Sequence, residues 1–164
     1  MTETTQLKSP SKYHQDFVVW CEDTVAKLKD RDIEGLDFEA LIEEIESLGL
    51  RDKRELKSRL GVLLAHLLLA HLLKRLYVQS PNDYCGWQNA IADQRREIEL
   101  LIEQSPSLKN YFVEVFEDSW RHALKRVKQD YPTVQLPDEW EFSRDLDAIL
   151  TEDFWLTDED GEKK

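Results

Sequence analysis

Four histidines are the residues of this chain whose side chains most readily do chemistry, because imidazole binds metal ions and transfers protons near neutral pH. His66 and His71 lie about 140° apart on a helix, so they cannot bind one metal ion from the same face. The chain has no HExxH motif and lacks the Glu-x-x-His pairs of carboxylate-bridged helical bundles. The spacing of histidines and glutamates along a single helix therefore predicts no metal site.

A metal site could still form between helices, if histidines of two helices met a carboxylate of a third. The candidate ligands for this arrangement are Glu43, Glu44, Glu46, His66 and His122. The cofactor would be a divalent transition metal, bound by each ligand at about 2 Å. The more ordinary interpretation is that such histidines bond to a carbonyl, hydroxyl or carboxylate group of a helical core, in which case no cofactor is needed.

Motifs for other kinds of catalysis and for nucleotide binding are absent. The chain contains no GxSxG nucleophile elbow, no Walker-type loop and no GxGxxG loop. Its two cysteines, Cys21 and Cys85, form no CxxC pair, which indicates small apolar side chains in a reducing compartment. We therefore predict no catalytic residue, and an enzyme is the less favoured interpretation.

Aromatic residues toward the C-terminus are the second group that could carry a function. Trp120 lies about 100° from the centre of the apolar stripe of its helix. Three more, Trp140, Phe154 and Trp155, lie in weakly patterned segments. Because aromatic side chains are enriched at protein interfaces, these four are candidate partner-binding residues. The alternative is that they pack a C-terminal arm onto its own domain.

The apolar stretch LGVLLAHLLLAHLL, from Leu60 to Leu73, must position the two central histidines. Its leucines and alanines are strong helix formers, and it is far too long for a buried strand. It is shorter than the roughly 20 apolar residues that cross a bilayer, and basic residues border both of its ends. We predict a core helix from about Lys53 to Val78, and no membrane span.

Two helices are predicted before the central helix. The second of them begins after Asp37 as N-cap and ends at Gly49, because glycine followed by Leu50 suits a Schellman C-cap. The first runs from about 11 to 29, with a core stripe of Tyr13, Phe17, Trp20, Thr24 and Leu28. The second helix is predicted to bury Phe38, Leu41, Ile42, Ile45 and Leu48.

Three helical segments are predicted after the central helix, at about 84–104, at about 106–130, and a short last one that opens at Asp138 or Ser143 and runs through Asp145 to Leu150. The middle one begins at Ser105-Pro106, places His122 on its inward side, and stops before Tyr131-Pro132. We therefore predict an all-α fold, an antiparallel bundle of four to five main helices with a short C-terminal helix or arm. Its domain organisation is a flexible N-terminus at 1–10, a single helical domain at 11–156 and an acidic flexible tail at 157–164.

Charge restricts the partners of the protein. The net charge of −12 argues against general nucleic-acid binding, which needs clustered Lys and Arg. One local basic run is interpreted as a solvated helix face that pairs with the acidic helix before it; it consists of Arg51, Lys53, Arg54, Lys57 and Arg59. The first residues lack the apolar region of a secretory signal, so the expected location is the cytoplasm.

Several segments, in order along the chain, resemble a known bacterial family. They are YHQDFVVW (13–20), GLDFEALIEEIESLG (35–49), RELKSRLGVLLAHLL (54–68), GWQNAIADQRREI (86–98) and SPSL (105–108). Together they are similar to the family catalogued as domain of unknown function twenty-nine, which is abundant in cyanobacteria. The resemblance implies a small helical cytoplasmic protein of cyanobacterial origin and supplies no catalytic role. Such proteins often continue from the first histidine directly into lysine and an aromatic, which leaves His66 as a better candidate than His71.

Three hypotheses of function follow from these patterns. The first is an interaction or adaptor module without catalytic activity, which binds another protein or a second copy of itself. The second is a helical bundle that binds a metal or a small molecule through His66, His122 and a glutamate of the second helix. The third and weakest is an acidic mimic that sequesters a basic partner.

Overall fold

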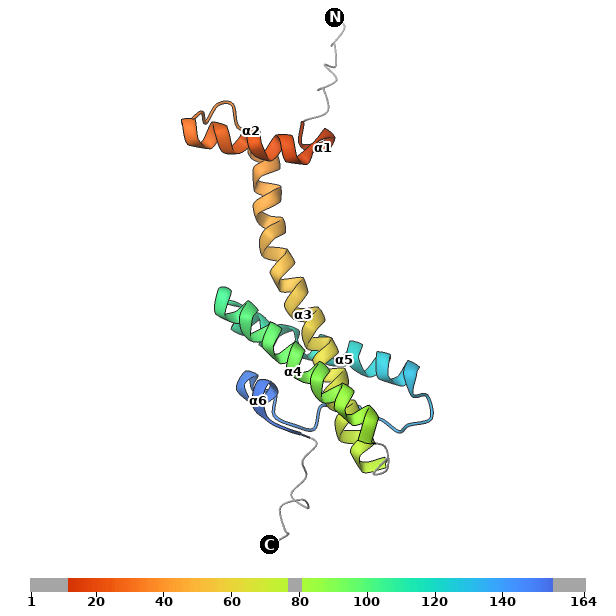
Figure 1. Ribbon diagram of the computed structural model, residues 1–164. Coiled ribbons are helices and arrows are strands. Elements are labelled where there is room, and N and C mark those ends of the chain that lie inside the picture. The colour runs from red at the N-terminus through yellow and green to blue at the C-terminus, as the bar shows by residue number, and fades with distance from the viewer. Residues whose placement is uncertain (1–11, 77–80, 155–164) are drawn as a thin grey trace, which may run out of the picture. The chain divides into compact units, whose positions relative to one another are not determined.

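The computed structural model describes residues 12–76 and 81–154, and the side chains of 12–72 and 86–154. Within these residues the fold is all-α, as predicted (Figure 1). The helices are α1 (Lys12–Gln15), α2 (Phe17–Asp30), α3 (Phe38–Leu76), α4 (Pro81–Gln104), α5 (Leu108–Asp130) and α6 (Leu146–Thr151). The predicted flexible N-terminus and acidic tail lie outside the described residues.

Chain contacts divide the protein into two compact units, an N-terminal unit of Met1–Leu50 and a C-terminal unit of Arg51–Lys164. The sequence predicts one domain over 11–156, so this division is a feature that the patterns do not indicate. Residues 38–50 of α3 belong to the N-terminal unit, and the remainder of this helix belongs to the C-terminal unit.

The N-terminal unit begins with a break that the apolar periodicity does not predict. In place of one helix over 11–29, α1 ends at Gln15 and α2 begins at Phe17. Between them Asp16 has extended backbone angles, and its carboxylate accepts a hydrogen bond of 3.1 Å from the Val19 backbone N–H. This is N-cap chemistry, which satisfies a backbone donor at the start of α2.

Helix α3 is one helix, and the predicted break at Gly49 is wrong. Asp37 caps its start as predicted, since the Asp37 carboxylate accepts a hydrogen bond of 3.1 Å from the Ala40 N–H. Gly49 lacks the positive φ that a Schellman cap requires, so the helix continues through it. Glycine within a helix costs about 1 kcal/mol, which strong helix formers on both sides offset. No described helix carries an apolar stretch long enough to cross a membrane.

The core of the C-terminal unit is one cluster of buried residues from α3, α4, α5 and the segment that follows. Among the described leucines of the apolar stretch, Leu69 and Leu72 are partly buried and the others are buried, as predicted. They meet Ile91 and Ile98 of α4 and Phe112 and Trp120 of α5. The turn before α5 is closed by a hydrogen bond of 2.9 Å from the Leu108 N–H to the Ser105 carbonyl, and α5 begins two residues after the predicted Pro106.

The chain after α5 folds back as an arm on this core, and α6 confirms a short last helix, although it begins at Leu146 and not at the predicted Asp138 or Ser143. Trp140, Phe142 and Phe154 of the arm form an aromatic cluster with Phe116 and Trp120 of α5. The indole N–H of Trp140 donates to the Ser143 carbonyl at 3.0 Å. The aromatics therefore dock the arm on its own domain.

Candidate functional site

Exposed apolar side chains of the described residues gather in the N-terminal unit. All but two of the large ones lie between residues 17 and 50, and the two exceptions are Leu100 and Val113. The members within the N-terminal unit are Phe17, Val18, Val19, Val25, Leu28, Ile33, Phe38, Ile42, Ile45, Leu48 and Leu50. Contiguous exposed apolar surface on a monomer marks an interaction site, whereas scattered residues need no explanation. We call these eleven residues the apolar surface.

On α2 most of the apolar surface is one half of a wide stripe, while Val19, two residues after Phe17, lies on the opposite side of the helix. Phe17, Cys21, Val25 and Leu28 recur at spacings of four, four and three residues, which places them along one side of the helix. The neighbouring flank, with Trp20 and Thr24, is buried. The prediction that the whole stripe is core is therefore right for Trp20 and Thr24 and wrong for Phe17 and Leu28, because only one flank of α2 is covered.

On α3 the apolar surface follows the spacing of a coiled-coil seam. Phe38, Ile45 and Leu48 alternate at three and four residues with Leu41, which is half-buried, and Ile42 lies beside them. The prediction that this face is buried is wrong, since Ile45 is 61% and Leu48 is 55% exposed. A different side of α3 is covered, where Ala40 is only 5% exposed.

The covered side of α3 carries a polar contact as well. The Tyr13 hydroxyl of α1 donates a hydrogen bond of 2.6 Å to the Glu44 carboxylate of α3. This bond, together with burial and the charges of Glu43 and Glu44, raises the pKa of Tyr13 to about 12. The aromatic rings of Tyr13 and Trp20 meet edge to face, with centroids 4.9 Å apart. These contacts fix which face of α3 stays outside.

The edge of the α3 seam is acidic. Glu39, Glu43 and Glu46 are exposed and follow one side of the helix at spacings of four and three residues. Between Phe38 and Leu50 the chain has no lysine or arginine to balance them. The apolar surface on α3 is thus bordered by a row of negative charge, which attracts a cationic partner and repels an anionic one.

The structure places the predicted partner-binding aromatics inside the C-terminal unit. Trp120 is 1%, Trp140 is 6% and Phe154 is 8% exposed, so these side chains offer little surface to a partner. Trp120 lies off the apolar stripe in the sequence, but its flank is covered by the arm, whose Trp140 ring lies 5.1 Å from the Trp120 ring. Trp155 lies outside the described residues.

The structure also shows where the predicted metal ligands lie. Glu43 and Glu46 are exposed, and the Glu44 carboxylate accepts the hydrogen bond from the Tyr13 hydroxyl. His66 is half-buried, and its Nδ1 lies 2.8 Å from the Val62 carbonyl of its own helix. The prediction that His122 faces inward is wrong, because its side chain is 68% exposed. Among the described residues no group of three or more His, Cys, Asp or Glu could hold a metal ion, so the ligand set remains a prediction without geometric support.

The remaining central histidine has a structural contact. His71 is buried, and its Nδ1 lies 3.1 Å from the Phe154 carbonyl of the arm. A carbonyl oxygen only accepts hydrogen bonds, so Nδ1 is the protonated nitrogen of this ring. The ring also meets Phe142 edge to face at 4.8 Å. His71 therefore joins α3 to the arm.

The fold and the exposed surface define an all-α protein with a packed C-terminal unit and a smaller N-terminal unit that presents apolar helix faces. The family model for domain of unknown function DUF29 matches residues 12–155. The chain belongs to this family. No curated protein and no solved structure gives a match to the chain.

Proposed function

We propose that this protein is a cytoplasmic protein–protein interaction module that binds its partner through the apolar surface of the N-terminal unit. The observation that carries the proposal is that α2 and the first part of α3 both expose apolar side chains at helical spacing. Burial of such side chains contributes roughly 25 cal/mol per Å² of apolar area, so a partner that covers them gains affinity from every residue of the stripe.

The shape of the surface favours a helix as its occupant. Seam residues of α3 at alternating spacings of three and four form the pattern that receives the side chains of a second helix. The exposed flank of α2 in the same unit adds further apolar area from Phe17 to Leu28. Amphipathic helices bind apolar grooves and faces through residues at the same repeat.

The charge of the surface decides the chemistry of that helix. Glu39, Glu43 and Glu46 border the seam, so the matching helix carries lysine or arginine beside its apolar stripe. A second copy of this chain would bring the same glutamates against the first, and like charges in contact disfavour the pair. We therefore propose a basic amphipathic helix of another protein as the occupant.

The proposal is tested with the full chain and a synthetic helical peptide that has leucine at the a and d positions and lysine beside them. We expect this peptide to bind in calorimetry, and a peptide with glutamate in place of lysine to bind at least tenfold more weakly. Ile45→Ser in the protein should weaken binding of the lysine peptide by at least tenfold. Val113→Ser is the matched control, because Val113 is a β-branched side chain that is 73% exposed but belongs to α5.

Two results would overturn the proposal. Equal binding of the lysine peptide by the Ile45→Ser and Val113→Ser variants would show that general charge attraction, and not the apolar surface, holds the peptide. A dimeric wild-type chain in sedimentation, converted to a monomer by Ile45→Ser, would show that a second copy occupies the surface.

A further inference from the structure

A second surface feature of different chemistry lies within the C-terminal unit. A pocket of about 330 Å³ opens between α3 and α5. Its ionisable lining residues are all cationic or neutral, namely Arg54, Lys57, His122 and Arg126. In a chain of net charge −12, this cavity is a local concentration of cationic side chains, although Asp118 pairs with Lys57 and its carboxylate lies 3.8 Å from the His122 Nδ1.

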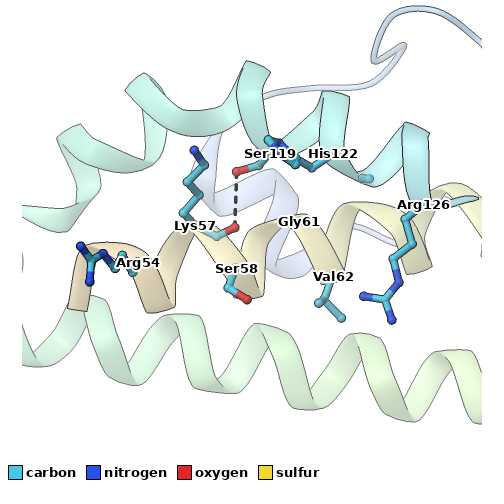
Figure 2. A pocket seen from close by; sticks show the side chains of 9 residues that line it. Arg54, Lys57, Ser58, Gly61, Val62, Ser119, His122 and Arg126 are labelled. Atoms are coloured by element: carbon cyan, nitrogen blue, oxygen red, sulfur yellow. Dashed lines mark hydrogen bonds between the residues drawn. The ribbon is translucent and has the colours of Figure 1, made fainter. Parts of the chain in front are cut away.

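The pocket has an arginine at each end and both apolar and polar residues between them. Figure 2 shows Arg54 at one end of the row of lining residues and Arg126 at the other, with Gly61 and Val62 between them. Ala123 of α5 adds a further apolar wall. Ser58 and Ser119 also line the pocket, and the Ser119 hydroxyl donates to the Lys57 carbonyl at 3.4 Å.

The cations of the pocket differ in how far they are already paired. Lys57 forms an ion pair with Asp118, and this pairing raises the pKa of Lys57 and lowers the pKa of Asp118. Within the described part of the chain, Arg54 and Arg126 have no carboxylate at ion-pair distance. Their guanidinium groups are therefore the donors that an incoming anion would engage.

His122 is oriented by its own helix. Its Nδ1 lies 2.7 Å from the Asp118 carbonyl, which can only accept a hydrogen bond, so Nδ1 carries a proton. The second ring nitrogen, Nε2, is then the one left for a ligand. His122 and Arg126 are four residues apart on α5, and in Figure 2 the His122 side chain lies beside Ser119 while Arg126 lies at the end of the row of lining residues.

We propose that this pocket binds a small organic phosphate. The phosphate group would contact Arg126, since guanidinium donors match phosphate oxygens in charge and geometry. The organic part would lie against Val62 and Ala123. A volume of about 330 Å³ is at the small end of ligand pockets, which limits the ligand to one compact group beside the phosphate.

The test uses the full chain and phenylphosphonate, which joins an apolar ring to a non-hydrolysable phosphate analogue. We expect saturable binding of one molecule per chain in isothermal titration calorimetry. Arg126→Gln should weaken it by at least tenfold. Arg121→Gln is the matched control, because Arg121 lies on the same helix, pairs with Glu117 at 3.6 Å and does not line the pocket. It should change the affinity less than twofold, although it removes the same charge.

Further binding measurements test the role of the apolar wall and the role of the anion separately. Inorganic phosphate should bind at least tenfold more weakly than phenylphosphonate, and equal binding would overturn the role of the apolar wall. Benzyl alcohol should not compete, and competition would overturn the role of the anion. No saturation with phenylphosphonate, or equal affinities of the Arg126→Gln and Arg121→Gln variants, would overturn the site itself. Arg126 is exposed, so its replacement leaves the core intact.

Discussion

The Tyr13 hydroxyl and the Glu44 carboxylate are joined by a hydrogen bond of 2.6 Å between α1 and α3. Loss of the phenol proton would break this hydrogen bond and place a second negative charge beside the carboxylate, so the pKa of Tyr13 is raised to about 12. Since the folded pKa exceeds the ordinary value near 10, the bond contributes stability below pH 10. That contribution is lost as the pH rises through about 12.

A spectroscopic titration checks this relationship. The absorbance of tyrosinate in wild type minus that in Tyr13→Phe isolates Tyr13, and we expect its midpoint at about 12. Glu44→Gln should bring the midpoint back toward 10, because the carboxylate is the main cause of the shift. Glu43→Gln is the control and should have a smaller effect, since Glu43 acts through its charge alone. A Tyr13 midpoint near 10 in the wild type would show that the bond does not form in solution.

Gly49 provides a test of the continuous α3 helix. A methyl group added at Gly49 meets no atom within 4 Å, and the residue lacks a positive φ. Gly49→Ala should therefore raise the free energy of unfolding by about 0.5–1 kcal/mol, because alanine loses less backbone freedom in a helix. Urea denaturation measures the change. A Schellman cap at this position would give the opposite sign, since alanine is strained at positive φ.

Gly49 is a position at which the sequence pattern does not determine the local fold. The all-α class, the leucine-rich core helix and the α6 helix follow from periodicity and propensity, and the structure contains them. The pair Gly49-Leu50 matches a C-cap signal, but glycine is also tolerated within a helix, and the local sequence does not separate these two states. The prediction of one continuous helix over 11–29 is wrong for a related reason, because the capping side chain of Asp16 interrupts an otherwise continuous apolar stripe.

Trp140 is the centre of the aromatic cluster that docks the arm. Its ring lies 5.1 Å from Trp120, 5.3 Å from Phe142 and 5.7 Å from Phe154, measured between centroids. Trp140→Ala should lower the free energy of unfolding by about 3–5 kcal/mol, the usual effect of removing a buried aromatic side chain. Leu100→Ala is the control, because Leu100 is 48% exposed and its loss should be small. Equal effects of the two substitutions would contradict the packing of the arm.

The candidate surface could be predicted from the sequence only in part. Stripes at helical spacing identify Phe38 and Ile45 as one face of a helix, but the same stripe serves a core or a partner. Which of the two applies depends on what covers the face, and the structure leaves Ile45 exposed while the equally periodic Leu56 and Leu60 are buried. The pocket depends on α3 and α5 lying together, which no local spacing indicates, although the basic run that contains Arg54 and Lys57 is visible in the sequence.

The hypothesis of a bound metal can be tested by elemental analysis. We expect the purified full chain to hold less than about a tenth of an equivalent of transition metal, because a bound ion needs three or more converging ligands. Elemental analysis after growth with added iron, zinc and manganese checks this. A content near one equivalent that falls in both His66→Ala and His122→Ala would instead establish the predicted ligand set.

Arg95 of α4 is the clamp that holds the end of the arm. Its Nε donates to the Ile149 carbonyl at 2.9 Å, one Nη donates to the Glu152 carbonyl, and the other lies 3.6 Å from the Asp153 carboxylate. The side chain is only 12% exposed, and this burial lowers the pKa of Arg95, an effect that the charge of Asp153 partly offsets. One cation therefore satisfies backbone acceptors at the C-terminal end of α6.

Replacement of this clamp should release the arm while the helices of the core remain folded. Arg95→Met keeps the apolar stem and removes the donors, so we expect a loss of about 1.5–3 kcal/mol in the free energy of unfolding. Hydrogen exchange should rise within residues 140–154 and change little in α3. Arg96→Met is the control, since Arg96 is the exposed neighbour on the same helix. Unchanged exchange in the arm of the Arg95→Met variant would show that the aromatic cluster and His71 hold it without the clamp.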